Sequence, residues 1–242
     1  MARGGVFDAT VTVAAGMAIL VGLGIWQLDR KAWKEELIAR TTAQLAAKAE
    51  DLPPRVQWDK IDAATTEYHR VQFPAEFIAG EEALVYTNGS AFRPDVKGIG
   101  YWVLSPARLA GGSIVIVNRG FVPIEAKAPS SRATPPGLVD ITGVIRWPDA
   151  RNLFTPADEP ANNVWYVRDP KLIAASKNWG DVAPFLVDLE APQPVGGLPR
   201  AAPLTVSLPN NHLQYALTWF GLALGLAGVY ITWLAARLRR RR

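Results

Sequence analysis

Cysteine is absent from this chain of 242 residues, and histidine and methionine occur only twice each. Without cysteine, disulfide bonds, thiolate metal sites and covalently attached c-type haem are excluded. Two methionines and no cysteine also argue against direct carriage of copper. A folded domain outside the membrane must therefore be held together by packing alone.

Charge is absent from two long stretches, residues 9–28 and 213–236. Each has about 20 residues or more, which as a helix cross the roughly 30 Å hydrocarbon core of a bilayer. The first stretch is longer than the apolar part of a secretory signal peptide, and no small-x-small cleavage site follows it. We therefore predict two transmembrane helices, at residues 9–28 and 210–236, and the first is expected to be an uncleaved anchor.

Positive charge is concentrated near the C-terminal end, where five of the last six residues are arginine. Positive residues that flank a span stay in the cytoplasm, so residues 1–8 and the Arg-rich tail at 237–242 are both expected there. Residues 29–209 then lie outside, which is the periplasm for a bacterial inner (plasma) membrane. The five arginines exceed the net charge of +4, and no basic face with interleaved aromatics indicates nucleic-acid binding.

Alternating apolar and polar residues dominate the segment between the spans. The pattern predicts an amphipathic helix at 30–48 that Pro53-Pro54 ends, a short helix at 171–177, and a hairpin turn at Asn88-Gly89. Strands are predicted at 71–77, 84–87, 101–104, 114–117, 139–145, 164–167 and 185–188. Short strands separated by turn signals favour an antiparallel β sandwich or a partly open barrel. The expected fold is a membrane α-hairpin whose two transmembrane helices flank an extracytoplasmic β domain with short helices.

Catalytic motifs are also missing from the sequence. There is no GxSxG elbow, HExxH pair, P-loop or Rossmann glycine fingerprint. Only His69 and His212 could act as histidine bases, and they fall in different parts of the chain. The spacing of the 22 aspartates and glutamates singles out no catalytic pair. We therefore predict that the protein is not an enzyme, and we interpret His69 as an exposed residue at the start of a strand.

His212 stands where the second predicted span begins. Pro209 cannot continue a helix from the preceding chain, and Asn210 or Asn211 is a good N-cap, so His212 is expected in the first helical turn. The positive end of the helix dipole and partial desolvation both disfavour the imidazolium there. A neutral imidazole has a free nitrogen lone pair that can bind iron. His212 is therefore the candidate metal ligand of the chain.

Aromatic residues follow His212 at helical spacing. Tyr215 and Trp219, at i+3 and i+7, would form a wall suited to a flat hydrophobic macrocycle. The same three residues also make an ordinary aromatic belt at a membrane interface. Residue chemistry alone leaves both interpretations open.

The end of the first span reaches the same membrane boundary with Trp26, Gln27 and Arg30. Arg30 could pair with a haem propionate or extend to lipid head groups. Glycines in both spans would let the helices approach closely in lipid. These glycines are at positions 16, 22, 24, 221, 225 and 228.

Six stretches form an ordered set along the chain: LGIWQLDRKAWKEELI at 23–38, GYWVLSP at 100–106, VNRGFVP at 117–123, RNLFTP at 151–156, NVWYVRD at 163–169 and LPNNHLQYALTWFGLA at 208–223. In this order they resemble the Surfeit locus protein 1 (Shy1-type) family of cytochrome oxidase assembly factors. The resemblance covers nearly the whole chain, including both spans. Phe121 stands where most members of that family have tryptophan.

The resemblance implies a membrane protein that assists the maturation of haem-copper oxidase, in particular the placement of haem a in subunit I. In bacterial members a histidine of the second span is implicated in binding haem a, and the matching position here is His212. Asn118 and Arg119 match a domain motif whose role we interpret as structural, with the charged side chain pinning a neighbouring loop. The expected partners are oxidase subunit I, membrane lipid and haem A synthase as the source of the haem.

The sequence and the resemblance leave three candidate functions. The first is a chaperone that holds haem a transiently and passes it to subunit I. The candidate cofactor-binding residues are His212, Tyr215, Trp219, Trp26, Gln27 and Arg30, with His212 as the metal ligand. The second is a cofactor-free membrane scaffold that stabilises subunit I during assembly. The third, a b-type electron-transfer cytochrome, is disfavoured because such haems normally take two axial histidines and this membrane region has one.

Overall fold

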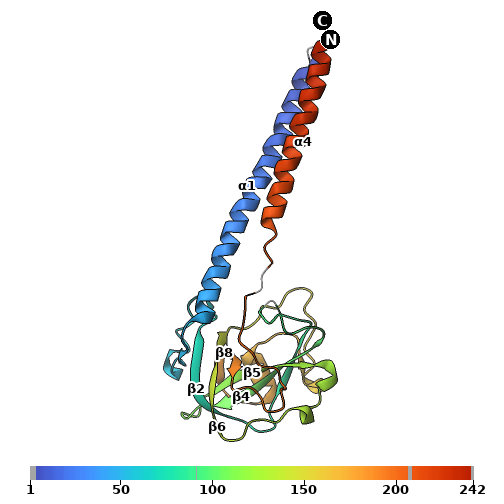
Figure 1. Ribbon diagram of the computed structural model, residues 1–242. Helices are drawn as coiled ribbons and strands as arrows, with labels where there is room; N and C mark the ends of the chain where they lie inside the picture. Colours follow the sequence, from blue (N-terminus) through green and yellow to red (C-terminus); the bar gives the residue numbers. More distant parts are fainter. Residues whose placement is uncertain (1–3, 91, 207–208, 241–242) are drawn as a thin grey trace. The chain divides into compact units, whose positions relative to one another are not determined.

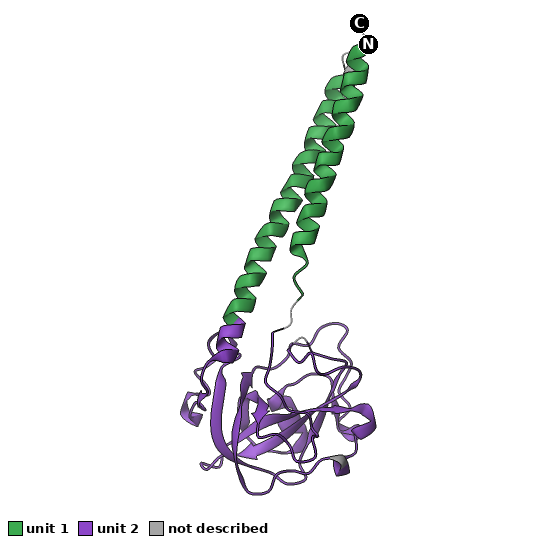
Figure 2. Cartoon of the chain, viewed as in Figure 1, with its two compact units in different colours: residues 1–40, 208–242 green, residues 41–207 purple. Residues whose placement is uncertain are grey.

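The computed structural model describes residues 4–90, 92–206 and 209–240. The chain divides into two compact units, residues 1–40 with 208–242 and residues 41–207 (Figure 2). The first unit is a pair of long helices, and the second is a β domain. The predicted α-hairpin and β domain are therefore both present.

The helical pair consists of α1, Gly4–Ala46, and α4, His212–Arg239, which run side by side (Figure 1). They have 43 and 28 residues, or about 65 and 42 Å at a rise of 1.5 Å per residue. Both are long and apolar enough to cross a membrane, and the chain is a two-pass membrane protein. The amphipathic helix predicted at 30–48 continues α1 without a break and ends at Ala46, before the two prolines.

The two helices meet along a seam with the repeat of a coiled coil. The less exposed positions of α4 include a series in steps of four and three, at 212, 216, 219, 223, 226, 230, 234 and 237, with 220 and 227 beside it. This spacing averages 3.5 residues and keeps one stripe against the partner helix. Ala216 and Ala223 are buried in the seam. The hydroxyls of Thr10 and Tyr230 lie 2.5 Å apart across it.

Only part of the predicted glycine interface is used. A Cβ atom on Gly24 would lie 2.4 Å from the ring of Phe220, and one on Gly16 would lie 3.2 Å from Leu226. The glycines at 22, 221, 225 and 228 have open space on that side. The helices therefore approach by large residues of α4 packing over glycines of α1. Each α4 glycine comes two residues after a seam position, 219, 223 or 226, and therefore lies on a different face of the helix.

The β domain has eight strands and two short helices. The strands are β1 Glu50–Asp51, β2 Arg70–Phe77, β3 Ala83–Thr87, β4 Gly100–Arg108, β5 Ile114–Pro123, β6 Leu138–Arg146, β7 Val164–Trp165 and β8 Val182–Ala191. The helices are α2 Ala63–Thr66 and α3 Pro170–Lys177, and single 3-10 turns occur at Arg55–Gln57, Ile124–Ala126, Pro129–Ser131 and Pro160–Asn162. All seven predicted strands are present, and β1 is the strand that the pattern missed because two residues show no periodicity.

Five of the strands close into a barrel. Their order is β2-β6-β8-β5-β4, and β2 returns to β4 through the pairs Glu76↔Arg108 and Phe77↔Ala107. β1, β3 and β7 extend the sheet beyond the ring. The barrel alternative of the predicted fold is therefore confirmed. Within the ring β5 and β8 are parallel, which requires a long crossover. That crossover contains β6, β7 and α3.

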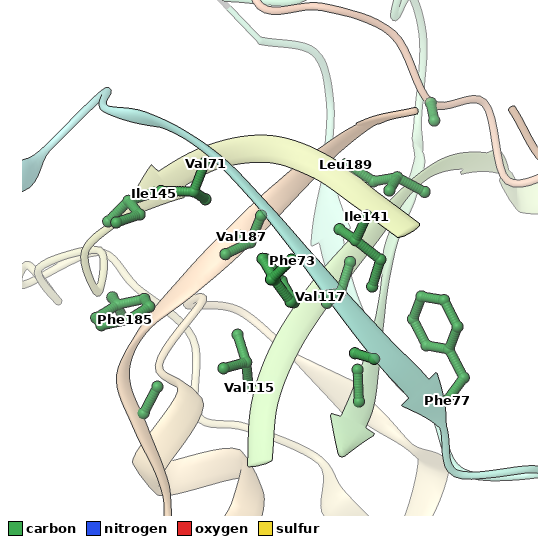
Figure 3. Packing of buried hydrophobic residues seen from close by; sticks show 14 of the residues in the cluster. Val71, Phe73, Phe77, Val115, Val117, Ile141, Ile145, Phe185, Val187 and Leu189 are labelled. Carbon is green, nitrogen blue, oxygen red and sulfur yellow. The ribbon is translucent and has the colours of Figure 1, made fainter. Parts of the chain in front are cut away.

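The barrel interior is a continuous hydrophobic core (Figure 3). Val71, Phe73, Ala75 and Phe77 of β2 are buried and alternate with exposed residues, as the period-two pattern predicts. By contrast, β5 is buried at every residue except its last. A second cluster, which includes Ile173 of α3, covers the outer face of this part of the sheet. Strands covered on both faces lose the alternation.

The Asn88-Gly89 signal marks a longer connection than a two-residue turn. β3 and β4 pair antiparallel as the hairpin prediction requires, with Thr87 opposite Gly100. The connection between them therefore spans residues 88–99. Gly89 has a φ of +131°, and the Thr87 hydroxyl donates to its carbonyl at 2.8 Å. The glycine thus starts a loop rather than closing a tight hairpin.

Candidate functional site

His212 is the first residue of α4, as predicted. Asn211 occupies the N-cap position, and its carbonyl accepts a hydrogen bond from the Tyr215 amide, although its side chain makes no capping bond. The ammonium group of Lys34 on α1 donates to the carbonyl of Pro209. The segment that enters α4 is therefore tied to α1 directly ahead of His212.

The imidazole of His212 is hydrogen bonded across the helical pair. Its Nδ1 lies 2.7 Å from Oε1 of Gln27. His212 belongs to the α4 seam, and both side chains are half-buried between the helices. The structure thus brings together two of the six predicted site residues, one from each span.

Two buried polar atoms of the helical pair have no hydrogen-bond partner within the described residues. They are Nε1 of Trp219 and Oδ1 of Asn210. Trp219 shares the seam with His212, and Asn210 stands two residues before it. An unpaired buried donor or acceptor costs about 1–3 kcal/mol. A water molecule or a polar group of a ligand could complete their hydrogen bonding, as it could for Ser105 Oγ and Trp165 Nε1 in the β domain.

The other predicted aromatics lie off the seam. Tyr215 is 56% exposed and Trp26 is 52% exposed. On a 3.5-residue repeat the seam passes from His212 to Ala216 and Trp219, so position 215 falls to one side. The wall expected from Tyr215 and Trp219 is therefore reduced, on the face toward α1, to Trp219 alone.

Arg30 does not enter the seam either. Its guanidinium lies over the ring of Trp33, 4.2 Å from the ring centre. In the described part of the chain no hydrogen bond or ion pair is found for it. Its N–H groups are therefore free for an anionic group from outside the protein, whether a propionate or a lipid head group.

Two lysines of the site were not predicted. Lys31 and Lys34 follow Gln27 at i+4 and i+7, which is the seam spacing. Lys31 pairs with Glu35 at 2.7 Å, and Lys34 donates to Pro209 as described. The signal that would have found them is the heptad repeat of α1, which continues past the apolar stretch.

His69 lies in the β domain, directly before β2. Its carbonyl accepts a hydrogen bond from the Ile145 amide at 2.9 Å, and its side chain is half-buried. A pocket of about 100 Å³ is lined by His69, Lys48, Arg70 and Glu50, with Gln44 and Ala47. Across the described residues, no group of three or more His, Cys, Asp or Glu side chains is placed to hold a metal ion.

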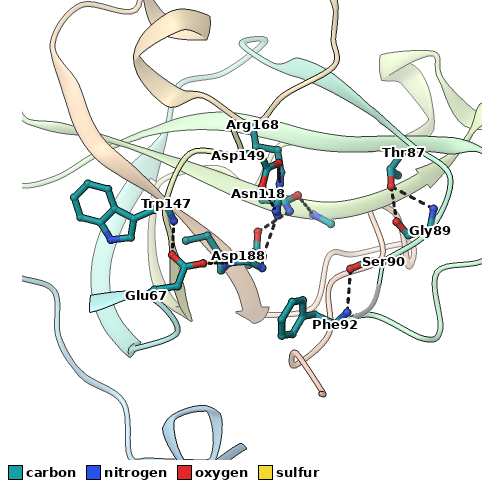
Figure 4. A network of polar contacts seen from close by, with 12 residues as sticks. Glu67, Thr87, Gly89, Ser90, Phe92, Asn118, Trp147, Asp149, Arg168 and Asp188 are labelled. Atoms are coloured by element: carbon teal, nitrogen blue, oxygen red, sulfur yellow. Dashed lines mark hydrogen bonds and ion pairs between the residues drawn. The ribbon is translucent and has the colours of Figure 1, made fainter. Parts of the chain in front are cut away.

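A buried cluster of charges in the β domain is satisfied internally (Figure 4). Asp188 of β8 accepts from Asn118 Nδ2 at 2.7 Å, and its Oδ2 lies 3.4 and 3.5 Å from Nη1 of Arg146 and Arg168. Arg168 also makes a bidentate pair with Asp149 at 2.8 and 2.9 Å. Burial alone would lower the pKa of Arg168, but the two carboxylates outweigh it and hold that pKa above its usual range. The adjoining cavity, of about 10 Å³, has room for one water molecule.

Asn118 and Arg119 have the structural role that we predicted. Asn118 bridges Asp188 and the amide of Gly120, which donates to its Oδ1 at 3.1 Å. Arg119 is 1% exposed, and its Nη2 donates to the carbonyl of Ala133 in the 128–137 loop. Burial lowers the pKa of Arg119, and the nearby charge of Glu82 offsets part of that shift. The side chain therefore pins a loop against the barrel.

Comparison with known proteins covers most of the chain. The SURF1 family matches residues 14–224. A SURF1-like protein of Monosiga brevicollis is 33% identical over 232 residues, which cover 91% of this chain and 84% of that protein. Surfeit locus protein 1 of Rattus norvegicus is 30% identical over 92% of this chain and 74% of its own length. For Surfeit locus protein 1 of Homo sapiens the identity is 31%, over 84% of this chain and 69% of the human protein. The chain belongs to the SURF1 family.

Proposed function

We propose that this protein is an assembly factor for a haem-copper terminal oxidase that transiently binds haem a and aids its insertion into oxidase subunit I. The observation that carries the proposal is the His212 imidazole, which is bonded to the opposite span through Nδ1 and has no partner for Nε2 among the described residues. Family membership and two membrane helices support the same role. The proposed role has no catalytic step, so the protein is not expected to be an enzyme.

The proposed location is a bacterial inner membrane, with both termini in the cytoplasm and the β domain in the periplasm. The arginine-rich C-terminal tail supports this orientation through the tendency of positive flanks to stay inside. His212, at the opposite end of α4 from that tail, would then stand at the periplasmic boundary. Haem A synthase is the proposed source of the haem, and membrane lipid surrounds the pair of helices.

The residues present fit a haem. His212 offers one imidazole nitrogen, and Trp219 and Asn210 offer a buried hydrogen-bond donor and acceptor that have no partner among the described residues. When bound, haem a would supply an iron that accepts a nitrogen ligand and a macrocycle with polar substituents. His212 Nε2 would be the iron ligand, and the free guanidinium of Arg30 would bind a propionate. Trp26 and Tyr215, exposed on the helical pair, would cover apolar edges of the ring.

A single protein ligand suits transient holding. Stable b-type haems normally take two histidines, and this chain has only one in its membrane helices. His212 would be the single protein ligand of the iron, so the protein would hold haem a by one coordinate bond, which suits a transient carrier. The electron-transfer alternative is disfavoured on the same ground.

The test is the visible absorption spectrum of the purified protein after co-expression with the haem A pathway. We expect a haem a band in the wild type and in His69→Ala, and none in His212→Ala. His69→Ala is the matched control because it removes the other histidine of the chain. Retention of the band in His212→Ala would overturn the assignment of the ligand.

A cofactor-free scaffold is the second candidate, and an exposed turn of the β domain favours it. Leu153 and Phe154 are 94% and 89% exposed. The turn is held by Asn152. Its side-chain Oδ1 accepts a hydrogen bond from the backbone N–H of Phe154 at 2.8 Å, and its backbone N–H donates to Thr155 Oγ1 at 3.0 Å. A rigid turn that presents two large apolar side chains suits contact with another protein.

The scaffold predicts a different set of phenotypes. Oxidase maturation would survive His212→Ala and would fail in the double variant Leu153→Ser, Phe154→Ser. Oxidase activity and the haem a content of subunit I in membranes of the two strains distinguish the candidates.

A further inference from the structure

We propose that Gln27 is the positioning residue for His212: its amide oxygen holds the imidazole as the Nδ1–H tautomer and directs Nε2 toward the metal. The tautomer is a property of the protein alone, whereas the direction of Nε2 toward a metal rests on the proposed function.

The chemistry of the two side chains determines the direction of the bond. An amide oxygen has lone pairs and no hydrogen, so Gln27 Oε1 can only accept. His212 Nδ1 lies 2.7 Å from that oxygen, and in the proposed tautomer it carries the hydrogen. A neutral imidazole has one N–H, so Nε2 keeps its lone pair and is the nitrogen able to bind iron.

The bond is held by packing on both sides along the helical pair. One turn from Gln27, toward the N-terminus of α1, the ring of Phe220 covers Gly24. Two turns in the other direction, Lys34 donates to the Pro209 carbonyl. These contacts fix the separation of the helices at the level of Gln27. Because this separation is fixed, the Gln27 side chain determines the orientation of the His212 ring.

The effect on the metal ligand follows from the identity of the acceptor. Metal-binding histidines usually donate their second N–H to a carboxylate or carbonyl, which fixes the ring and makes the free nitrogen more basic. A neutral amide increases basicity less than a carboxylate does. Gln27 would therefore raise the basicity of Nε2 by less than a carboxylate partner would. We expect its removal to lower haem affinity about 10–100-fold.

The tautomer can be measured without haem. We propose ¹⁵N NMR of the full-length, histidine-labelled protein in detergent at about pH 8, where an ordinary histidine is neutral. With only two histidines, His69→Gln leaves the signal of His212 alone. In that background we expect a protonated Nδ1 and an unprotonated Nε2, and a shift toward the Nε2–H form in Gln27→Leu. Gln27→Glu should keep the Nδ1–H form because a carboxylate also accepts.

Gln214→Leu is the matched control. Gln214 is the glutamine of α4, is exposed, and lies off the seam. Its substitution should leave the tautomer unchanged. Equal proportions of the two tautomers in wild type and Gln27→Leu would overturn the proposal.

A second readout concerns the iron–histidine bond. In the protein loaded with ferrous haem a, the frequency of the Fe–His stretch in resonance Raman spectra should fall in Gln27→Leu and rise in Gln27→Glu. The rate of haem loss should rise about 10–100-fold in the first variant and fall in the second. Unchanged frequencies in both variants contradict the positioning role while leaving haem binding by His212 intact. Absence of any haem band in the wild type contradicts the proposed function instead, and the NMR result still decides the tautomer.

Discussion

Gly24 is the residue on which the close approach of the two membrane helices depends. A Cβ atom there would lie 2.4 Å from the Phe220 ring, well inside van der Waals contact. In lipid the helices gain little from apolar burial, so packing at such positions supplies much of their attraction. The hydrogen bond between His212 and Gln27 lies one turn away on α1 and depends on the same spacing.

We predict that Gly24→Val destabilises the helical pair by about 1–3 kcal/mol, the usual cost of overpacking. The measurement is denaturant unfolding of the full-length protein in detergent. Gly22→Val is the control, because a Cβ at Gly22 meets nothing within 4 Å, and it should unfold like the wild type. Phe220→Ala should restore stability to the Gly24 variant, and failure of this rescue would show that the cost arises elsewhere.

The site was only partly predictable from single residues. Proline, asparagine and the start of an apolar stretch placed His212 in the first turn of α4, because capping is a local property. Tyr215 was expected on the same face as His212 because i+3 neighbours lie close on a helix, but the seam follows a 3.5-residue repeat that passes through Ala216 instead. Lys31 and Lys34 were missed because charge was taken as the end of the membrane segment.

Among the elements of the β domain, adjacent strands β6, β8 and β5 share one buried ion cluster. Asp188 of β8 stands opposite Val144 of β6 and Asn118 of β5. Its side chain is 8% exposed and that of Arg146 is 9% exposed. Removing one partner of a buried pair leaves a charge that neither water nor protein neutralises.

We predict that Asp188→Ala lowers the free energy of unfolding by about 3 kcal/mol or more, because Arg146 and Arg168 lose a shared carboxylate. Asp140→Ala provides the matched control on β6. Asp140 is exposed and has no ion pair within the described residues, so its loss should cost less than about 0.5 kcal/mol. Chemical denaturation followed by tryptophan fluorescence compares the two. Equal stabilities would mean that the cluster contributes nothing net.

The stability of the β domain should also fall in acid. The hydrogen bond from Arg93 lowers the pKa of Asp95. Burial alone would raise the pKa of Asp149, but hydrogen bonds and charge from Arg168 outweigh burial and lower it. A carboxyl with a lowered pKa in the folded state stabilises the fold above its unfolded pKa, about 3.9 for aspartate. That contribution is lost as pH falls through the lowered folded value.

Asp149→Asn should therefore flatten the dependence of the unfolding free energy on pH below about 5. The effect should be modest because the Asp149 side chain is 42% exposed and solvent screens the pair. Thermal melting between about pH 2 and pH 7 measures the slope, with Asp140→Asn as the control. An identical slope in Asp149→Asn and wild type would contradict the assignment.

At the scale of the whole molecule, the two compact units have separate means of stabilisation. Residues 41–207 contain a closed barrel with its own hydrophobic cores. A closed ring leaves no unpaired edge among its five strands, and edges are where isolated sheets associate. The helical pair instead relies on close packing in lipid.

We predict that a fragment of residues 41–207 folds by itself, with a cooperative thermal transition and no haem a band. Circular dichroism and absorption spectroscopy of the purified fragment check both parts. A control fragment that ends before β8, at residue 181, should remain unfolded because β8 joins β5 to β6 in the ring. A non-cooperative transition in the longer fragment would show that the barrel requires the membrane helices.

The sequence by itself determined the features that depend on neighbours along the chain: two membrane helices, seven strands, and His212 at the start of a helix. Periodicity and capping are local, so they can be read from a single segment. Only the tertiary structure decided the closure of β2 on β4, the parallel pairing of β5 and β8, and the hydrogen bond between His212 and Gln27. Each of these joins residues far apart in sequence, and their geometry depends on how whole elements pack.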